Sequence, residues 1–229
     1  MSVCRKTSIL YKILKVTSKH ESYYFILLVS VVERRNLYME LIFIRHGEGE
    51  HTLNTPNSLQ ISDPILSDEG INQAELLRTQ FPLSKEDILV ISPLRRALLT
   101  AHYWSKGINC KKTVNPLVSP RIFPQVSQGR TLPCDRLLDR QKISVDFPDI
   151  QIEEELSEEL WANGINILPQ EIFNQLAKQF LEWCKQQEAP IIYIISHDGT
   201  ITSYREFITG DILTRDDFPK ETGWFNLKF

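Results

Sequence analysis

The feature that most restricts the fold of this chain is a pair of short runs that are hydrophobic at every position. These are Leu41–Ile44 and Ile191–Ile195. A strand with one face in water alternates apolar and polar residues, whereas a strand buried on both faces does not. Both runs therefore predict strands: Leu41–Ile44 is the first strand, and Ile191–Ile195 is a buried central strand. Because helical stretches alternate with such runs along the sequence, we expect an α/β fold.

The remaining elements follow from spacing and from capping residues. Ser67 is a candidate helix cap before a helical repeat, and Pro93 suits the entry of a second helix after a strand over Asp87–Ile91. The helix after Ser67 is defined by the apolar positions Ile71, Ala74, Leu77 and Phe81, and the helix after Pro93 by Leu94, Leu98 and Ala101. A third helix, over Glu171–Gln187, is defined by Ile172, Leu176, Phe180 and Trp183. The acidic run Glu153–Glu159 is interpreted as a solvated helix face, and Thr222–Phe229 as an edge strand.

The pattern is lost between about residues 110 and 150, where prolines recur and no period is evident. A stretch of this length in a compact domain is a lid, a binding loop or a misread element. Its arginines either contact an anionic substrate or lie in solvent, and the sequence does not distinguish the two. They are Arg121, Arg130, Arg136 and Arg140.

The first 38 residues differ from the rest in charge. They contain seven Lys or Arg and two Glu, a net charge of +5, which leaves 19 basic and 27 acidic residues downstream, a net charge of −8. The apolar run Tyr23–Val32 is too short to span a bilayer, and Glu33-Arg34-Arg35 follows it in place of a cleavage site. We interpret residues 1–38 as a dispensable extension before a start at Met39. A packed extra element, or a targeting or interfacial segment, is the alternative.

Composition excludes several classes of function. The acidic body argues against nucleic-acid binding, and no stable membrane insertion is expected. The four cysteines, Cys4, Cys110, Cys134 and Cys184, are widely spaced, which is typical of neither a disulfide framework nor a zinc site. We therefore expect one cytoplasmic domain over residues 39–229. The oligomeric state cannot be predicted.

Chemically active residues follow the ends of three predicted strands. Arg45 and His46 follow the strand Leu41–Ile44, and Arg96 lies just after the strand Asp87–Ile91. His197 follows the strand Ile191–Ile195. In open α/β sheets ligands bind at the carboxyl edge, so these side chains should meet. A neutral imidazole is a nucleophile near pH 7, and guanidinium groups match phosphate oxygens. The constellation predicts a phosphate pocket.

Four segments, in order, resemble the histidine phosphatase superfamily, which has the phosphoglycerate-mutase-like fold. They are L-I-F-I-R-H-G-E at 41–48, D-P-I-L-S-D-E-G-I-N-Q-A at 63–74, S-P-L-R-R-A-L-L-T-A at 92–101 and I-I-Y-I-I-S-H-D-G at 191–199. The resemblance implies a three-layer α/β/α sandwich with a mostly parallel central sheet. It also implies a phosphomonoester hydrolase acting on a small phosphorylated substrate through a phosphohistidine. A phosphoglycerate-type mutase and a catalytically weak phosphate-binding scaffold are the alternatives.

The resemblance assigns roles to matching positions. His46 would be the nucleophile, and Arg45, Arg96 and His197 would bind the phosphoryl oxygens, with His197 protonated among them. Arg95, one residue before the matching arginine, is interpreted as a solvated or secondary contact. Neither a metal nor a cofactor is implied, because fixed cations supply the positive charge.

The chain departs from the family pattern in two places. Many members have a glutamate that acts as proton donor about two dozen positions after the second arginine, but this region here contains no acid. Asp198 resembles the His-Asp pair of the acid-phosphatase branch and is our first candidate for that donor, unless it is only a helix cap. Asp135 is the reserve. Where sugar-phosphate mutases have asparagine, this chain has Thr52, which can still bind phosphate, and His51 is expected to be a rim residue.

Overall fold

The computed structural model describes residues 9–17, 22–30, 39–126, 128–187 and 189–228 of the 229-residue chain. It divides into two units, Met1–Leu37 and Tyr38–Phe229. In the first unit, β1 (Ile9–Thr17) pairs antiparallel with β2 (Ser22–Ser30), which includes most of the apolar run noted above. Residues 31–38, with the end of that run and its charged flank, lie outside the described part. No helix within the described ranges is both long and apolar enough to cross a membrane.

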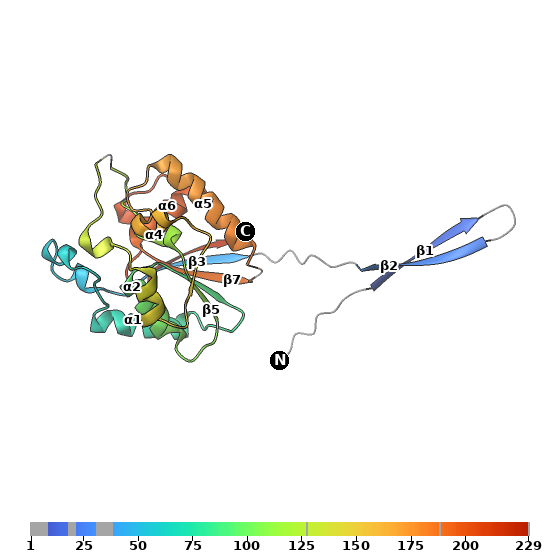
Figure 1. Ribbon diagram of the computed structural model, residues 1–229, viewed down its shortest axis with the longest axis horizontal. Coiled ribbons are helices and arrows are strands. Elements are labelled where there is room, and N and C mark those ends of the chain that lie inside the picture. Colours follow the sequence, from blue (N-terminus) through green and yellow to red (C-terminus); the bar gives the residue numbers. More distant parts are fainter. Residues whose placement is uncertain (1–8, 18–21, 31–38, 127, 188, 229) are drawn as a thin grey trace. The chain divides into compact units, whose positions relative to one another are not determined.

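The second unit is built on a six-stranded sheet with the order β6-β5-β4-β7-β3-β8 (Figure 1). Every neighbouring pair is parallel except β3 with β8. The strands are β3 (Glu40–Arg45), β4 (Ile88–Ile91), β5 (Lys111–Val114), β6 (Gln151–Ile152), β7 (Ile191–Ser196) and β8 (Trp224–Lys228). Both apolar runs form strands, as predicted, and the run predicted to be central is β7, which lies beside β3. The strand β8 is the predicted edge strand.

Helices cover both faces of this sheet and make three layers, as Figure 1 shows for α5 and α6 against α1 and α2. The helices are α1 (Asp68–Gln80), α2 (Arg95–Ser105), α3 (Arg140–Asp146), α4 (Glu158–Asn163), α5 (Gln170–Lys185) and α6 (Asp198–Thr209). Successive β3 side chains enter opposite cores: Leu41 and Phe43 pack with α5 and α6, whereas Ile42 and Ile44 pack with α1 and α2. The two-sided burial explains why the four inner positions of the strand, Leu41–Ile44, are all apolar.

The structure corrects four details of the sequence prediction. The segment at 110–150 was partly misread, since it contains β5 and α3. Pro93 precedes α2, whose cap is Leu94. The run Glu153–Glu159 is mostly loop, because α4 begins only at Glu158. The buried face of α5 is also rotated from the predicted one: Ile172 is exposed, and the buried positions are Phe173, Ala177, Phe180, Leu181 and Cys184.

Candidate active site

The register of the central strands brings the two predicted histidines together. Arg45 pairs with Ser196 across β3 and β7, and the His46 amide then donates to the Ser196 carbonyl at 3.0 Å. The imidazoles of His46 and His197 follow at the same edge, with ring centroids 5.0 Å apart. The amino ends of α2 and α6 lie at this edge too, and helix amino ends favour anions. The parallel pairing alone therefore places two imidazoles at a site suited to phosphate.

The loop after β3 is fixed by α1 and α2. The Gly47 amide donates to Thr100 Oγ1 at 3.1 Å, and the Glu48 amide donates to Gln73 Oε1 at 2.9 Å. The Ser67 hydroxyl, which caps α1, donates to the Glu48 carboxylate at 2.6 Å. Two polar side chains of the motif at 63–74 therefore hold the loop that follows His46 in place.

Close backbone packing requires a glycine at position 70. A Cβ on Gly70 would collide with the Glu48 carbonyl oxygen, and a Cβ on Gly47 would lie 2.5 Å from the Gly70 carbonyl oxygen. Both obstacles are backbone atoms, so neither can rotate away. We expect Gly70→Ala to lower the free energy of unfolding by about 1–3 kcal/mol, as overpacking does.

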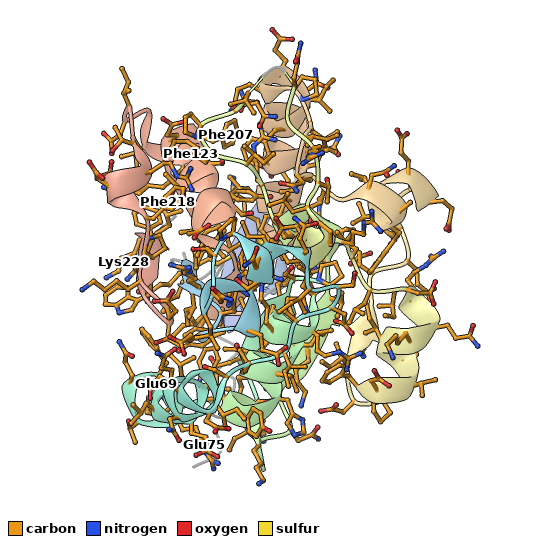
Figure 2. The ribbon with its side chains drawn as sticks, turned by 90° about the vertical axis from the view of Figure 1, so that its left-hand side faces the viewer. Glu69, Glu75, Phe123, Phe207, Phe218 and Lys228 are labelled. Carbon is orange, nitrogen blue, oxygen red and sulfur yellow. The ribbon has the colours of Figure 1, made fainter. Side chains whose placement is uncertain are left out.

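Urea denaturation would measure this change. Glu75→Ala is the matched control, because Glu75 is exposed on the same helix, as Figure 2 shows, and should shift stability by less than about 0.5 kcal/mol. An unchanged midpoint for Gly70→Ala would contradict the packing argument.

His46 is 2% exposed, and its hydrogen bonds determine its tautomer. Nδ1 lies 2.7 Å from the Gly47 carbonyl oxygen, which can only accept, so Nδ1 carries the proton. Arg96 Nε donates to Nε2 at 3.1 Å, so Nε2 presents its lone pair to the space that Arg96 lines. Burial, and then the positive charge of Arg96, hold the pKa of His46 well below 6.5. The ring is therefore a neutral imidazole whose Nε2 lone pair accepts from Arg96 Nε.

Arg96 is the centre of the site. Its side chain is 2% exposed, and it donates to His46, to the Cys134 carbonyl at 2.6 Å, to Asp135 Oδ1 at 2.9 Å and to His197 Nδ1 at 3.2 Å. The neighbouring Arg95 instead pairs with Asp63 and Asp146, away from both histidines. The choice between the two arginines therefore agrees with the structure.

The prediction that His197 is a cation differs from the structure. Because an arginine only donates, His197 Nδ1 accepts from Arg96, and the ring proton lies on Nε2, 2.7 Å from Ser92 Oγ. Burial and the charge of Arg96 hold the pKa of His197 well below 6.5. His197 is therefore neutral in this arrangement. A protonated His197 was predicted with phosphate bound, and the negative charge of a phosphate would oppose the lowering of the His197 pKa.

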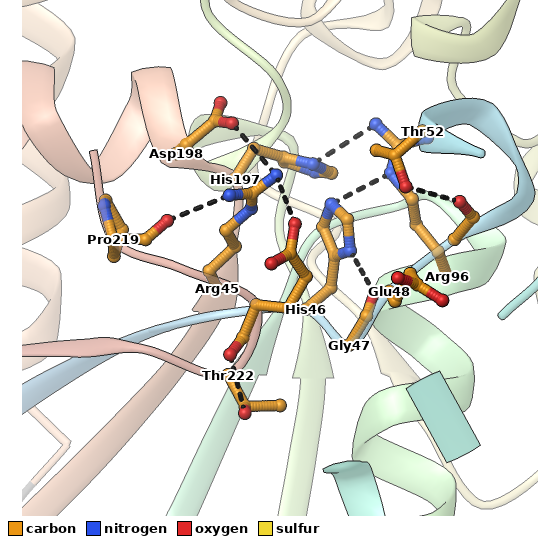
Figure 3. A network of polar contacts seen from close by, with 12 residues as sticks. Arg45, His46, Gly47, Glu48, Thr52, Arg96, His197, Asp198, Pro219 and Thr222 are labelled. Atoms are coloured by element: carbon orange, nitrogen blue, oxygen red, sulfur yellow. Dashed lines mark hydrogen bonds and ion pairs between the residues drawn. The ribbon is translucent and has the colours of Figure 1, made fainter. Parts of the chain in front are cut away.

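Arg45 enters the site from the opposite side to Arg96 (Figure 3). Its Nη1 donates to the Pro219 carbonyl at 2.9 Å, and its Nη2 pairs with Asp198 at 3.2 Å and with Glu221 at 3.0 Å. Arg45 Nε is buried, and no described residue accepts its hydrogen bond. One donor of this guanidinium is thus left for a ligand.

The two candidate acids have different surroundings. Asp198 accepts from Arg45 through Oδ2 and from the Gly199 amide through Oδ1 at 2.6 Å, and its side chain is 34% exposed. Asp135, in a short helical turn (Pro133–Asp135), is 22% exposed at its side chain and pairs with Arg96. Burial raises the pKa of Asp135 against the opposing charge of Arg96, and the charge of Asp198 raises it further. Each acid thus pairs with one arginine of the candidate site.

The sequence placed one residue near the loop wrongly, and the hydroxyl of a second residue has a partner within the loop. His51 is not at the rim: it is 8% exposed, and its ring centroid lies 5.5 Å from that of His46. Burial and the charges of Arg96 and Arg45 lower the pKa of His51 to about 3. The Thr52 hydroxyl donates to the Gly49 carbonyl at 2.8 Å, so its proton is already committed. A role for Thr52 in phosphate binding would require that bond to break.

The arginines of the segment at 110–150 divide into distinct groups. Arg121 is a structural residue: its guanidinium donates to the Ile165 and Leu168 carbonyls and lies 4.2 Å from the centroid of the Phe173 ring. Arg140 pairs with Glu158. Arg130 and Arg136 are exposed. Within the described ranges, no cluster of three or more histidine, cysteine or acidic side chains could hold a metal ion.

Residues 41–121, which carry β3, α1, β4, α2 and β5, match the family model of the histidine phosphatase superfamily, branch 1. Over these residues the chain is similar to this superfamily. Among curated relatives, a probable phosphatase of Schizosaccharomyces pombe is 38% identical over 64 residues. That match covers 26% of this chain and only 29% of the relative's length.

Solved phosphatase structures share the fold. An alpha-ribazole phosphatase from Shigella flexneri superposes with a TM-score of 0.53 at 20% identity. A phosphoserine phosphatase from Entamoeba histolytica, in complex with phosphoserine, has a TM-score of 0.51 at 20% identity. Each comparison covers 82% of this chain and 89% of the other. At such identity the likeness establishes the fold of this chain and not its substrate.

Two supporting residues of the candidate site were not predicted from the sequence. Ser92, the partner of His197, was noted only as part of a motif, although a hydroxyl at the end of a buried strand is itself a signal. Glu221, the partner of Arg45, lies in an unpatterned loop where no sequence signal could have identified it.

Proposed function

We propose that this chain is a metal-independent phosphomonoesterase that forms a phosphohistidine on His46. The observation that carries the proposal is the hydrogen-bonding of His46, which fixes the proton on Nδ1 and leaves the lone pair of Nε2 facing the donors of Arg96. An imidazole prepared in this way needs no general base to become a nucleophile. The family relationship supports phosphatase chemistry on small phosphorylated substrates.

The surrounding cations would bind the phosphoryl oxygens. Arg96 can exchange its contacts with the two imidazoles for phosphate oxygens, and Arg45 offers its unpartnered Nε. The negative charge of the bound dianion would raise the pKa of His197 and favour its protonated form, which is a third cation. Donors fixed before substrate arrives stabilise the transition state most effectively, because they need not reorganise. The hydrolytic water would then attack the phosphohistidine and release inorganic phosphate.

Activity is expected to survive a chelator, because the positive charge comes from fixed guanidinium groups. Purified protein would be incubated with para-nitrophenyl phosphate in excess EDTA, and both phosphate release and an acid-labile, base-stable phosphoprotein would be measured. We expect unchanged turnover and a trapped phosphohistidine. Loss of turnover that added Mg²⁺ restores would contradict metal independence, and turnover without any phosphoprotein would contradict the covalent route. The scattered cysteines support a cytoplasmic location for this activity.

A further inference from the structure

The proposed hydrolysis requires an acid, and the segment in which many family members have a glutamate contains none in this chain. When an alkyl phosphate is cleaved, the departing oxygen is a poor leaving group unless a nearby acid protonates it. Residues 116–121 follow β5 with no carboxylate, and the polar groups present there are committed. Ser119 Oγ accepts from the Ile165 amide at 3.1 Å, and its carbonyl accepts from Thr200 at 2.6 Å. The Arg121 side chain contacts Phe173 of α5.

A second turn of the same long segment brings a carboxylate to the site. We propose that Asp135 is the catalytic acid, which donates its proton to the leaving oxygen of the substrate; this inference rests on the proposed phosphohistidine mechanism. Arg96 fixes the turn at two points, through the Cys134 carbonyl and the Asp135 carboxylate. The same Arg96 Nη2 that contacts Asp135 also contacts His197. The acid is therefore tied directly to the phosphate-binding group.

Substrate binding itself would favour the protonated acid. Asp135 has a pKa that burial already raises and that Arg96 lowers. A phosphate dianion competes for the Arg96 donors, which weakens that opposing contact, and adds a negative charge beside the carboxylate. Both effects raise the pKa of Asp135 further, as like charges do. The titratable and charged groups that act on this carboxylate are Arg96, Cys134 and Asp198.

Asp198, the candidate favoured from sequence, is better suited to positioning Arg45. Each of its two oxygens already accepts a hydrogen bond, one from Arg45 and one from the Gly199 amide. Its carboxylate and that of Glu221 therefore orient the Arg45 guanidinium from two directions. The contacts of Asp198 and Glu221 with Arg45 are made without a substrate, and a leaving group takes no part in them.

In the proposed step, His46 Nε2 forms a bond to phosphorus while the bond from phosphorus to the leaving oxygen breaks. The leaving oxygen keeps both electrons of the broken bond and takes the proton of Asp135. The products are an alcohol, a phosphohistidine and the Asp135 carboxylate. This carboxylate then takes a proton from the water that attacks phosphorus, which releases inorganic phosphate and restores both residues.

Leaving-group dependence tests the assignment. Asp135→Asn would be compared with wild type on β-glycerol phosphate, whose alkoxide needs a proton, and on para-nitrophenyl phosphate, whose anion does not. We expect kcat to fall by about 10²–10⁴-fold on the alkyl ester but by less than about tenfold on the aryl ester. The fall of kcat at high pH, which reports loss of the acid's proton, should disappear in the variant. Asp139→Asn is the matched control, because this exposed aspartate only caps α3, as asparagine also can.

The outcomes separate the two proposals. If Asp135→Asn loses equal activity on both esters, or if only Asp198→Asn shows the selective loss, the Asp135 assignment is wrong while the phosphohistidine can still be trapped. If wild type yields no phosphohistidine, the proposed function itself fails. Should Asp135→Asn not fold, Asp135→Glu, which keeps an acid beside Arg96, must retain the wild-type ratio of alkyl to aryl activity; a changed ratio would overturn the assignment.

Discussion

Replacing His46 by alanine is expected to abolish turnover and phosphoprotein formation together. The alanine leaves no nitrogen to attack phosphorus, and His197 is not free to replace it, because its Nε2 contacts Ser92 and its Nδ1 contacts Arg96. Removal of a nucleophile costs at least about 10⁴-fold in kcat in enzymes that depend on covalent catalysis. Release of phosphate from para-nitrophenyl phosphate and acid-labile labelling would measure both losses.

A histidine outside the site provides the control. His102 is exposed on α2, so His102→Ala should keep wild-type rates and labelling. Circular dichroism would verify that both variants fold. If His46→Ala still formed an acid-labile phosphoprotein, the nucleophile would lie elsewhere. His51, whose buried ring is 5.5 Å from that of His46, would then be the first residue to examine.

The second large effect is expected at Arg96. Arg96→Ala should lower kcat/KM by about 10³–10⁵-fold, the range found when an arginine that stabilises phosphoryl transfer is removed. Arg96→Lys should recover only part of this loss, because an ammonium group cannot donate to several acceptors in the fixed fork of a guanidinium. Four contacts are lost with the alanine, so thermal unfolding must be measured beside the kinetics.

The adjacent arginine distinguishes this effect from a general loss of charge. Arg95→Ala removes the same charge one residue away, but its partners are Asp63 and Asp146 and no site residue contacts it. We expect its kcat/KM to stay within about threefold of wild type, as for surface substitutions away from a site. Equal losses in the two variants would show that Arg96 acts through the net charge and not through its contacts.

The central elements of the fold were predictable because their signals are local. Apolar runs that lack any polar alternation defined β3 and β7, and Ser67 marked the start of α1. The α5 face was misplaced because one helical repeat of apolar residues admitted two faces that share Phe180, and only packing against Tyr204 and the sheet selects the face that contains Phe173. The strand β5 was missed because its sequence, K-K-T-V, has little apolar signal of its own.

The sequence by itself determined that His46, Arg96 and His197 would meet, because the carboxyl ends of parallel strands share one edge of a sheet. Only the tertiary structure decided which side chains complete the site. It buried His51, committed the Thr52 hydroxyl to Gly49, and set Asp135 and Asp198 against different arginines. The physical reason is that these residues lie in or beside loops. Their directions depend on hydrogen bonds to segments distant in the chain, which no local pattern records.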